Sequence, residues 1–141
     1  MSAEIGAVIF CDDVRREQNG KDILIGVYSG DILIANFPFT LVLALWVEYL
    51  PTALGKQEAN FRISYDQKKI GDLRVEVDVL ETGPMGIPMT GLLFTGEKEG
   101  TLQLEFSSDG QKWRLIKERR IRTSSGVIPS SFAPVPPPTS S

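Results

Sequence analysis

Short apolar runs separated by turn residues make up most of the first 122 residues of the chain. The clearest alternation occupies residues 73–81, where Leu73, Val75, Val77 and Val79 alternate with charged residues. Residues 60–65 repeat this period of two. Because successive side chains of a strand point to opposite faces, both segments are predicted to be half-exposed strands.

Six other segments have the apolar content of strands with a less regular alternation. The first two are joined through Asn19 and Gly20, and this pair predicts a hairpin because both residues tolerate the positive φ of a type I′ turn. In the last segment the alternation slips at Ile116 and Lys117, which predicts a β-bulge or a strand buried on one face only in its first half. The six segments are residues 5–11, 23–28, 31–35, 92–95, 100–106 and 113–122.

Residues 40–50 have the almost wholly apolar sequence TLVLALWVEYL, for which a buried helix and a strand compete. Their length suits a short helix or a long strand. The flanking Pro38 and Pro51, the β-branched and aromatic residues, and the absence of an N-capping acidic box favour a strand.

Residues 83–91, GPMGIPMTG, combine three glycines with two prolines. Proline cannot donate a hydrogen bond to a sheet, and glycine weakens the interior of a strand. The segment is therefore predicted to be a long loop. It is not predicted to bind phosphate, since it lacks the Gly-Lys-Ser/Thr of a P-loop and does not open a helix.

Seven to nine strands at intervals of about ten residues are typical of a β-sandwich or a small barrel. We predict one all-β domain over residues 1–122, an antiparallel β-sandwich of immunoglobulin-like architecture. A chain of 141 residues has room for one such core. The single cysteine excludes the Cys-Trp-Cys spacing of antibody domains, so the term describes the architecture alone.

Residues 123–141 form a Pro/Ser-rich tail that is predicted to be extended, because it has little apolar surface to offset the entropy of ordering. Residues 134–138, PVPPP, have the composition of a polyproline II segment that docks into an aromatic-lined groove. A plain spacer is the alternative. The tail residues predicted to bind a partner are Phe132, Pro134, Val135, Pro136, Pro137 and Pro138.

The net charge of −3 is unevenly distributed, because residues 112–122 contain six Lys or Arg and one Glu. An acidic body with one basic strand does not suit a nucleic-acid binder, whose positive charge spreads over a whole face. It suits an acidic protein partner, and Arg119, Arg120 and Arg122 are predicted to bind one. The alternative is an edge strand protected by charge against pairing with another sheet.

Residues suited to catalysis are sparse. The chain has no histidine, which excludes Ser-His-Asp and Cys-His sites and removes the commonest zinc ligand. Cys11 lies in an apolar run, as a small buried hydrophobe does. Asp12 and Asp13, with Glu17, are the densest acidic cluster, and Asp12 and Asp13 are predicted to end the first strand as solvated turn residues. We therefore predict a protein that is not an enzyme and has no metal or cofactor.

Features of the sequence also bear on the compartment. One cysteine cannot form an intramolecular disulfide, and the first residues lack the basic start and cleavage pattern of a signal peptide. The longest apolar stretch, between Pro38 and Pro51, is shorter than the roughly 20 residues that a bilayer span needs. A reducing compartment without a membrane partner is predicted.

Residues 11–28, CDDVRREQNGKDILIGVY, resemble the start of an uncharacterised family of small β-rich bacterial and prophage proteins. Its members open with an apolar strand, a CDD-R-E segment and an NGK-LIGVY hairpin arm. The resemblance is limited to this segment. It implies a bacterial or phage origin, with the bacterial cytoplasm or a virion as the location, and it implies no activity and no catalytic residue.

Three functions remain open on these grounds. The leading hypothesis is a non-enzymatic structural or interaction protein, such as a phage capsid decoration or connector component whose C-terminal arm contacts neighbouring subunits. The alternative is a ligand- or glycan-binding sandwich that uses Trp46, Tyr49 or Trp113 as stacking platforms. A carboxylate-based hydrolase is the third, and it requires two acidic groups that face each other in a cleft.

Overall fold

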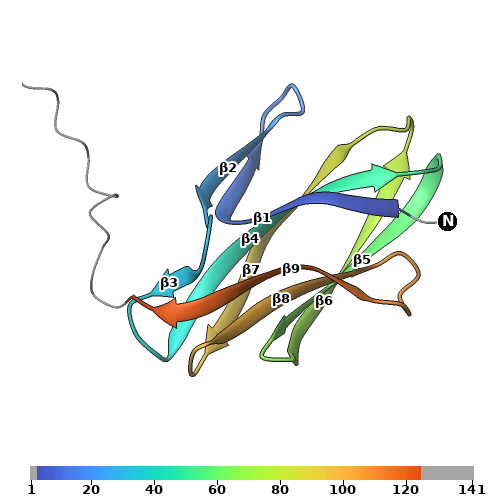
Figure 1. Ribbon diagram of the computed structural model, residues 1–141. Coiled ribbons are helices and arrows are strands. Elements are labelled where there is room, and N and C mark those ends of the chain that lie inside the picture. The colour runs from blue at the N-terminus through green and yellow to red at the C-terminus, as the bar shows by residue number, and fades with distance from the viewer. Residues whose placement is uncertain (1–2, 125–141) are drawn as a thin grey trace, which may run out of the picture.

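The computed structural model describes residues 3–124, and all regular structure in that range is β-strand (Figure 1). The all-β prediction is confirmed, with nine strands in the described range. The strands are β1 (Ala3–Arg16), β2 (Asp22–Val27), β3 (Ile32–Ile34), β4 (Phe39–Pro51), β5 (Gly55–Tyr65), β6 (Lys68–Val79), β7 (Met85–Gly96), β8 (Gly100–Ser107) and β9 (Arg114–Thr123).

The strands form two curled sheets. The first has the strand order β2-β1-β4-β7 and the second the order β3-β9-β8-β5-β6. Neighbouring strands run antiparallel except β3 and β9, which are parallel. This pairing joins segments about ninety residues apart and has no signal in the local sequence pattern, since it matches Ile32 with Ile121.

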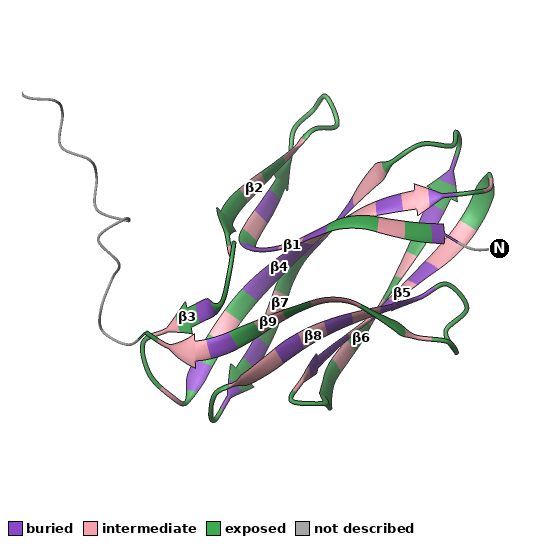
Figure 2. Cartoon of the chain, in the orientation of Figure 1, coloured by how far each residue is buried: buried purple, intermediate pink, exposed green. Residues whose placement is uncertain are grey.

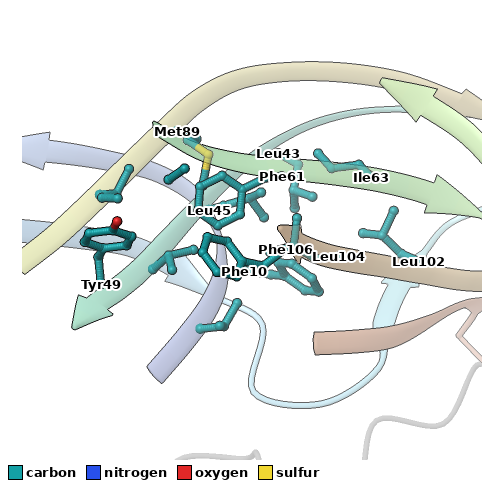
Figure 3. Close-up of a cluster of buried hydrophobic side chains, with 14 of the residues drawn as sticks. Phe10, Leu43, Leu45, Tyr49, Phe61, Ile63, Met89, Leu102, Leu104 and Phe106 are labelled. Carbon is teal, nitrogen blue, oxygen red and sulfur yellow. The ribbon is translucent and has the colours of Figure 1, made fainter. Parts of the chain in front are cut away.

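Side chains from both sheets meet in one apolar core (Figure 3). Tyr49 of β4 and Phe106 of β8 pack edge to face, with ring centroids 6.4 Å apart. Phe61 of β5 lies beside Phe106 at 5.4 Å and is fully buried. Burying an aromatic side chain stabilises a fold by about 2–3 kcal/mol relative to leaving it exposed, so this cluster is a main source of stability.

Residues 40–50 form a strand as predicted, in the interior of the first sheet between β1 and β7. Leu43, Leu45 and Val47 point into the core, and Ala44 on the opposite face of β4 is also fully buried. A strand covered on both faces is apolar at consecutive positions, which accounts for the sequence that resembled a buried helix.

The predicted loop at residues 83–91 is wrong, because β7 begins at Met85 and pairs with β4 through most of that segment. Pro88 lies opposite Trp46 in this ladder. The proline is tolerated because β7 is an edge strand, where one row of backbone groups has no neighbouring strand to bond. The glycines and prolines therefore mark a sheet edge and not a loop.

The ends of β1 and the turn after it also differ from expectation. β1 continues through Asp12 and Asp13 to Arg16, so these acids do not end the strand. The predicted hairpin is confirmed, and its turn is not of type I′: Gly20 has φ of 86°, whereas Asn19 is not among the residues with positive φ. The turn is closed by the Gly20 N–H, which donates to the Glu17 carbonyl at 3.1 Å.

The predicted bulge in the basic strand is confirmed. Leu104 lies opposite Lys117 and Glu105 lies opposite Leu115, so Ile116 is the extra residue of β9. The bulge shifts the alternation of β9 by one residue at that point.

Candidate interaction surface

The β1–β2 hairpin extends from the first sheet as an arm, defined here as residues 12–27 (Figure 1). Cys11 is the last β1 residue that pairs with β4, whereas the pairing of β1 with β2 continues to Arg16. Near the base of the arm Gly26 has φ of 67°, and a Cβ there would collide with the side chain of Asp12. A glycine is thus required at this position near the base of the arm.

One face of the arm packs on the outer side of the first sheet. Cys11 and Val14 of β1 form a small buried cluster with Ala44 of β4, against which Leu24 and Trp46 also pack. This contact covers the face of β4 that points away from the main core at Ala44 and Trp46. It also makes Cys11 a buried apolar residue, and its burial is the main cause that raises the pKa of its thiol.

Asp22 anchors the arm to this sheet. Its carboxylate accepts hydrogen bonds from Arg16 Nε at 2.9 Å and from the Trp46 indole at 3.0 Å. Arg16 in turn donates to the Gly86 carbonyl on β7 at 3.2 Å. The bond from Arg16 is the main cause that lowers the pKa of Asp22, because it stabilises the charged form.

The opposite face of the arm is apolar and open to solvent. Ile23, Ile25 and Val27 are 45%, 40% and 49% exposed. Figure 2 colours most of β2 as exposed. Arg15 lies opposite Ile23 and Asp13 lies opposite Ile25, so this apolar row has one basic and one acidic neighbour on β1.

The acidic cluster predicted at residues 12–17 is divided among structural roles. Asp12 accepts a 2.7 Å hydrogen bond from the Tyr28 hydroxyl, whose pKa rises to about 12, mainly through burial and also through this bond. Asp13 accepts from the Val14 N–H at 2.9 Å and lies 3.5 Å from Arg15. Over residues 3–124 no three His, Cys, Asp or Glu side chains are grouped so that they could hold a metal ion.

The three arginines of the basic strand do not form one patch. Arg119 lies opposite the fully buried Leu102 and is half-buried, which places it on the inner face of β9. Arg120 and Arg122 are engaged by acids of other segments, Glu99 at 3.1 Å and Asp31 at 2.8 Å. Partner binding by these residues stays a prediction.

The three aromatic candidates lie in different surroundings. Tyr49 is 1% exposed in the core, and Trp46 is covered by the arm through its bond to Asp22. Trp113 is half-buried, with the Arg62 guanidinium 4.0 Å from the ring centroid. The structure does not bring them together, and Arg62 occupies one face of the ring that a sugar would stack on.

An apolar hollow of about 210 Å³ lies between the edge strands β6 and β7. Aliphatic side chains such as Ile70, Leu73 and Leu92 line it, together with Phe94. It contains none of the three aromatic residues predicted from the sequence.

The predicted tail residues Phe132, Pro134, Val135, Pro136, Pro137 and Pro138 lie outside the described residues. Within the described part, no helix is long and apolar enough to cross a membrane.

Comparison with known proteins does not assign the chain to a family. No protein-family model matches it, and a search of curated proteins finds no match.

Proposed function

We propose that the chain is a non-enzymatic structural or interaction protein that binds protein subunits through the outer face of the arm. The observation that supports this is the exposure of three apolar side chains on a six-residue strand: Ile23 and Ile25 lie in one row, Val27 follows the kink at Gly26, and each is 40–49% exposed. Grouped apolar side chains on a protein surface mark interaction sites more often than isolated ones do.

The setting we propose is a phage virion, in which the chain is a decoration or connector component made in the bacterial cytoplasm. The segment that resembles bacterial and prophage proteins, residues 11–28, coincides with the arm, which supports a shared use of this hairpin. In this proposal Arg119, Arg120, Arg122 and residues 123–141 contact neighbouring subunits. We also propose that the two curled sheets are the layers of an immunoglobulin-like sandwich, supported by the core that both sheets share.

Sedimentation of lysates from cells that produce the protein natively tests this function. We expect the wild-type chain to sediment in an assembly heavier than two chains. Two variants should sediment as lighter species: one that carries both Ile23→Lys and Ile25→Lys, and one that ends at Ser124. Leu80→Lys is the matched control, because Leu80 is 82% exposed outside the arm. A wild-type chain that sediments alone or only as a pair would contradict the proposal. The glycan-binding alternative gains no comparable support from residues 3–124.

A further inference from the structure

We infer that the free edge of β2 binds β2 of a second copy of this chain, so that the two arms join into one antiparallel sheet. The inference rests on the proposed interaction function and names the first partner at the arm. It comes from a comparison of the sheet edges, from the direction of the backbone groups of β2, and from the charges beside its apolar row.

The four edge strands of the described chain are β2, β7, β3 and β6. An open edge pairs readily with another strand, and proteins prevent this with short strands, prolines, bulges or charges. β3 has three residues and β7 contains Pro88. The charged residues of β6 are Lys68, Lys69, Asp72, Arg74, Glu76 and Asp78.

β2 differs from these three edges. Residues 23–27 have the sequence ILIGV, with no charge and no proline, and the kink at Gly26 lies near the end of the strand. Among the edges in residues 3–124, β2 therefore has the least protection against pairing. Its length of six residues is enough for a short antiparallel ladder.

The turn determines which backbone groups of β2 face outward. Both backbone groups of Glu17 bond across the turn: its N–H donates to the Lys21 carbonyl at 2.7 Å and its carbonyl accepts from the Gly20 N–H at 3.1 Å, so the ladder starts with a hydrogen-bonded position at Glu17. Such positions alternate along an antiparallel ladder, so Ile23 and Ile25 bond to β1 while the N–H and C=O groups of Asp22 and Leu24 point to the free edge. These outward groups are the donors and acceptors available to a second strand.

Charge favours one register of the pairing. If Leu24 faces Leu24 of the second copy, Ile23 of each chain lies beside Ile25 of the other. Each of these apolar pairs then has Arg15 at one end and Asp13 of the second copy at the other. These opposite charges lie three strand spacings apart, roughly 14 Å, so they add a weak preference to the match of the apolar side chains. A register in which Ile23 faces Ile23 of the second copy would instead place Arg15 at both ends of that apolar pair. The pairing also joins the exposed apolar side chains of the two β2 strands into one larger surface, to which neighbouring subunits could bind.

Size-exclusion chromatography with light scattering on the purified full chain tests the pairing. We expect a mass that rises with concentration from 15.6 kDa toward twice that value. Ile25→Lys places a charge inside the central apolar pairs and should raise the dimer Kd at least about tenfold. Leu93→Lys is the matched control and should leave the dimer unchanged, since Leu93 is 64% exposed on β7 at the other edge of the same sheet.

A wild-type chain that stays monomeric at every concentration would overturn the inference, as would an Ile25→Lys variant that pairs like wild type. Equal loss of pairing in Leu93→Lys would also overturn it, because the surface would then be another one. Circular dichroism of each variant confirms that it is folded. If the purified chain is monomeric but still enters a heavy assembly in cells, only this inference is contradicted. If the purified chain dimerises but no heavier assembly is found in cells, only the proposed function is contradicted.

Discussion

β4 and β2 have similar sequences and different surroundings. Both contain consecutive apolar residues, a pattern expected of strands covered on both faces. From Leu43 to Val47 β4 is covered on both faces, by the core on one side and by the arm on the other, whereas Val42 before this stretch is 53% exposed. β2 is covered on one face only, and Ile23, Ile25 and Val27 are left exposed on the other. The comparison indicates that folding buries most of the apolar residues of β4, whereas it leaves three of the four apolar side chains of β2 exposed, which is the observation behind the proposed partner.

Removal of a core ring should have the largest effect on stability. Phe61→Ala deletes a side chain that is fully buried and packs against Phe106, and we expect the free energy of unfolding to fall by about 3–5 kcal/mol. Urea denaturation measures this loss. A loss below about 1 kcal/mol would show that the Phe61 ring contributes far less to stability than expected for a side chain whose removal leaves a buried cavity.

Loss of the arm anchor should have an intermediate effect. Asp22→Ala leaves the Trp46 indole without its acceptor and Arg16 without its carboxylate partner, and the Asp22 side chain is 9% exposed, so we expect a loss of about 1–3 kcal/mol in urea denaturation. Asp72→Ala is the control, because Asp72 also has two basic partners but is 46% exposed, and its loss should stay below about 1 kcal/mol. Equal losses of stability in the two variants would mean that the burial of Asp22 does not make its ion pair stronger than the exposed one at Asp72.

Acid should weaken the same anchor. The folded pKa of Asp22 lies below its ordinary value of 3.8, chiefly because of the bond from Arg16. The stabilisation is therefore complete above pH 3.8 and is lost as the pH falls through the lower folded pKa. The free energy of unfolding, measured from pH 5 down to pH 2, should decline more steeply for wild type than for Asp22→Asn. If the free energy of unfolding declines equally with pH in both proteins, carboxylates other than Asp22 cause the loss of stability in acid.

Changes on the open face of β2 should have the smallest effect. Ile25 is 40% exposed, so Ile25→Thr should change the free energy of unfolding by no more than about 0.5 kcal/mol in dilute monomeric protein. A loss above 2 kcal/mol would show that the isolated fold already uses this side chain. The comparison with β4 would then fail.

Strands with one buried and one exposed face could be predicted from the sequence. In β6, in β5 up to Ile63 and in β8 up to Phe106, the alternation of apolar and polar residues matches the observed burial, because neighbouring positions have contrasting surroundings. The slip near Ile116 likewise indicated the bulge.

Features set by distant contacts could not be predicted. Pro88 suggested a loop because the sequence does not reveal that β7 lies at an edge, where a missing N–H is tolerated. The bond from Trp46 to Asp22 joins residues 24 positions apart, so nothing local indicated that the arm covers β4. The acids at the base of the arm suggested a strand end, whereas each is held by a specific neighbour such as Tyr28.

Amide hydrogen exchange at Leu24 tests the central claim, that β2 is completed by a second copy, most directly. The Leu24 N–H points to the free edge in the single chain, so it should exchange rapidly in dilute protein and become protected as the concentration and the measured mass rise. The Ile23 N–H, which bonds to β1, should be protected throughout. Rapid exchange at Leu24 at every concentration would contradict the account.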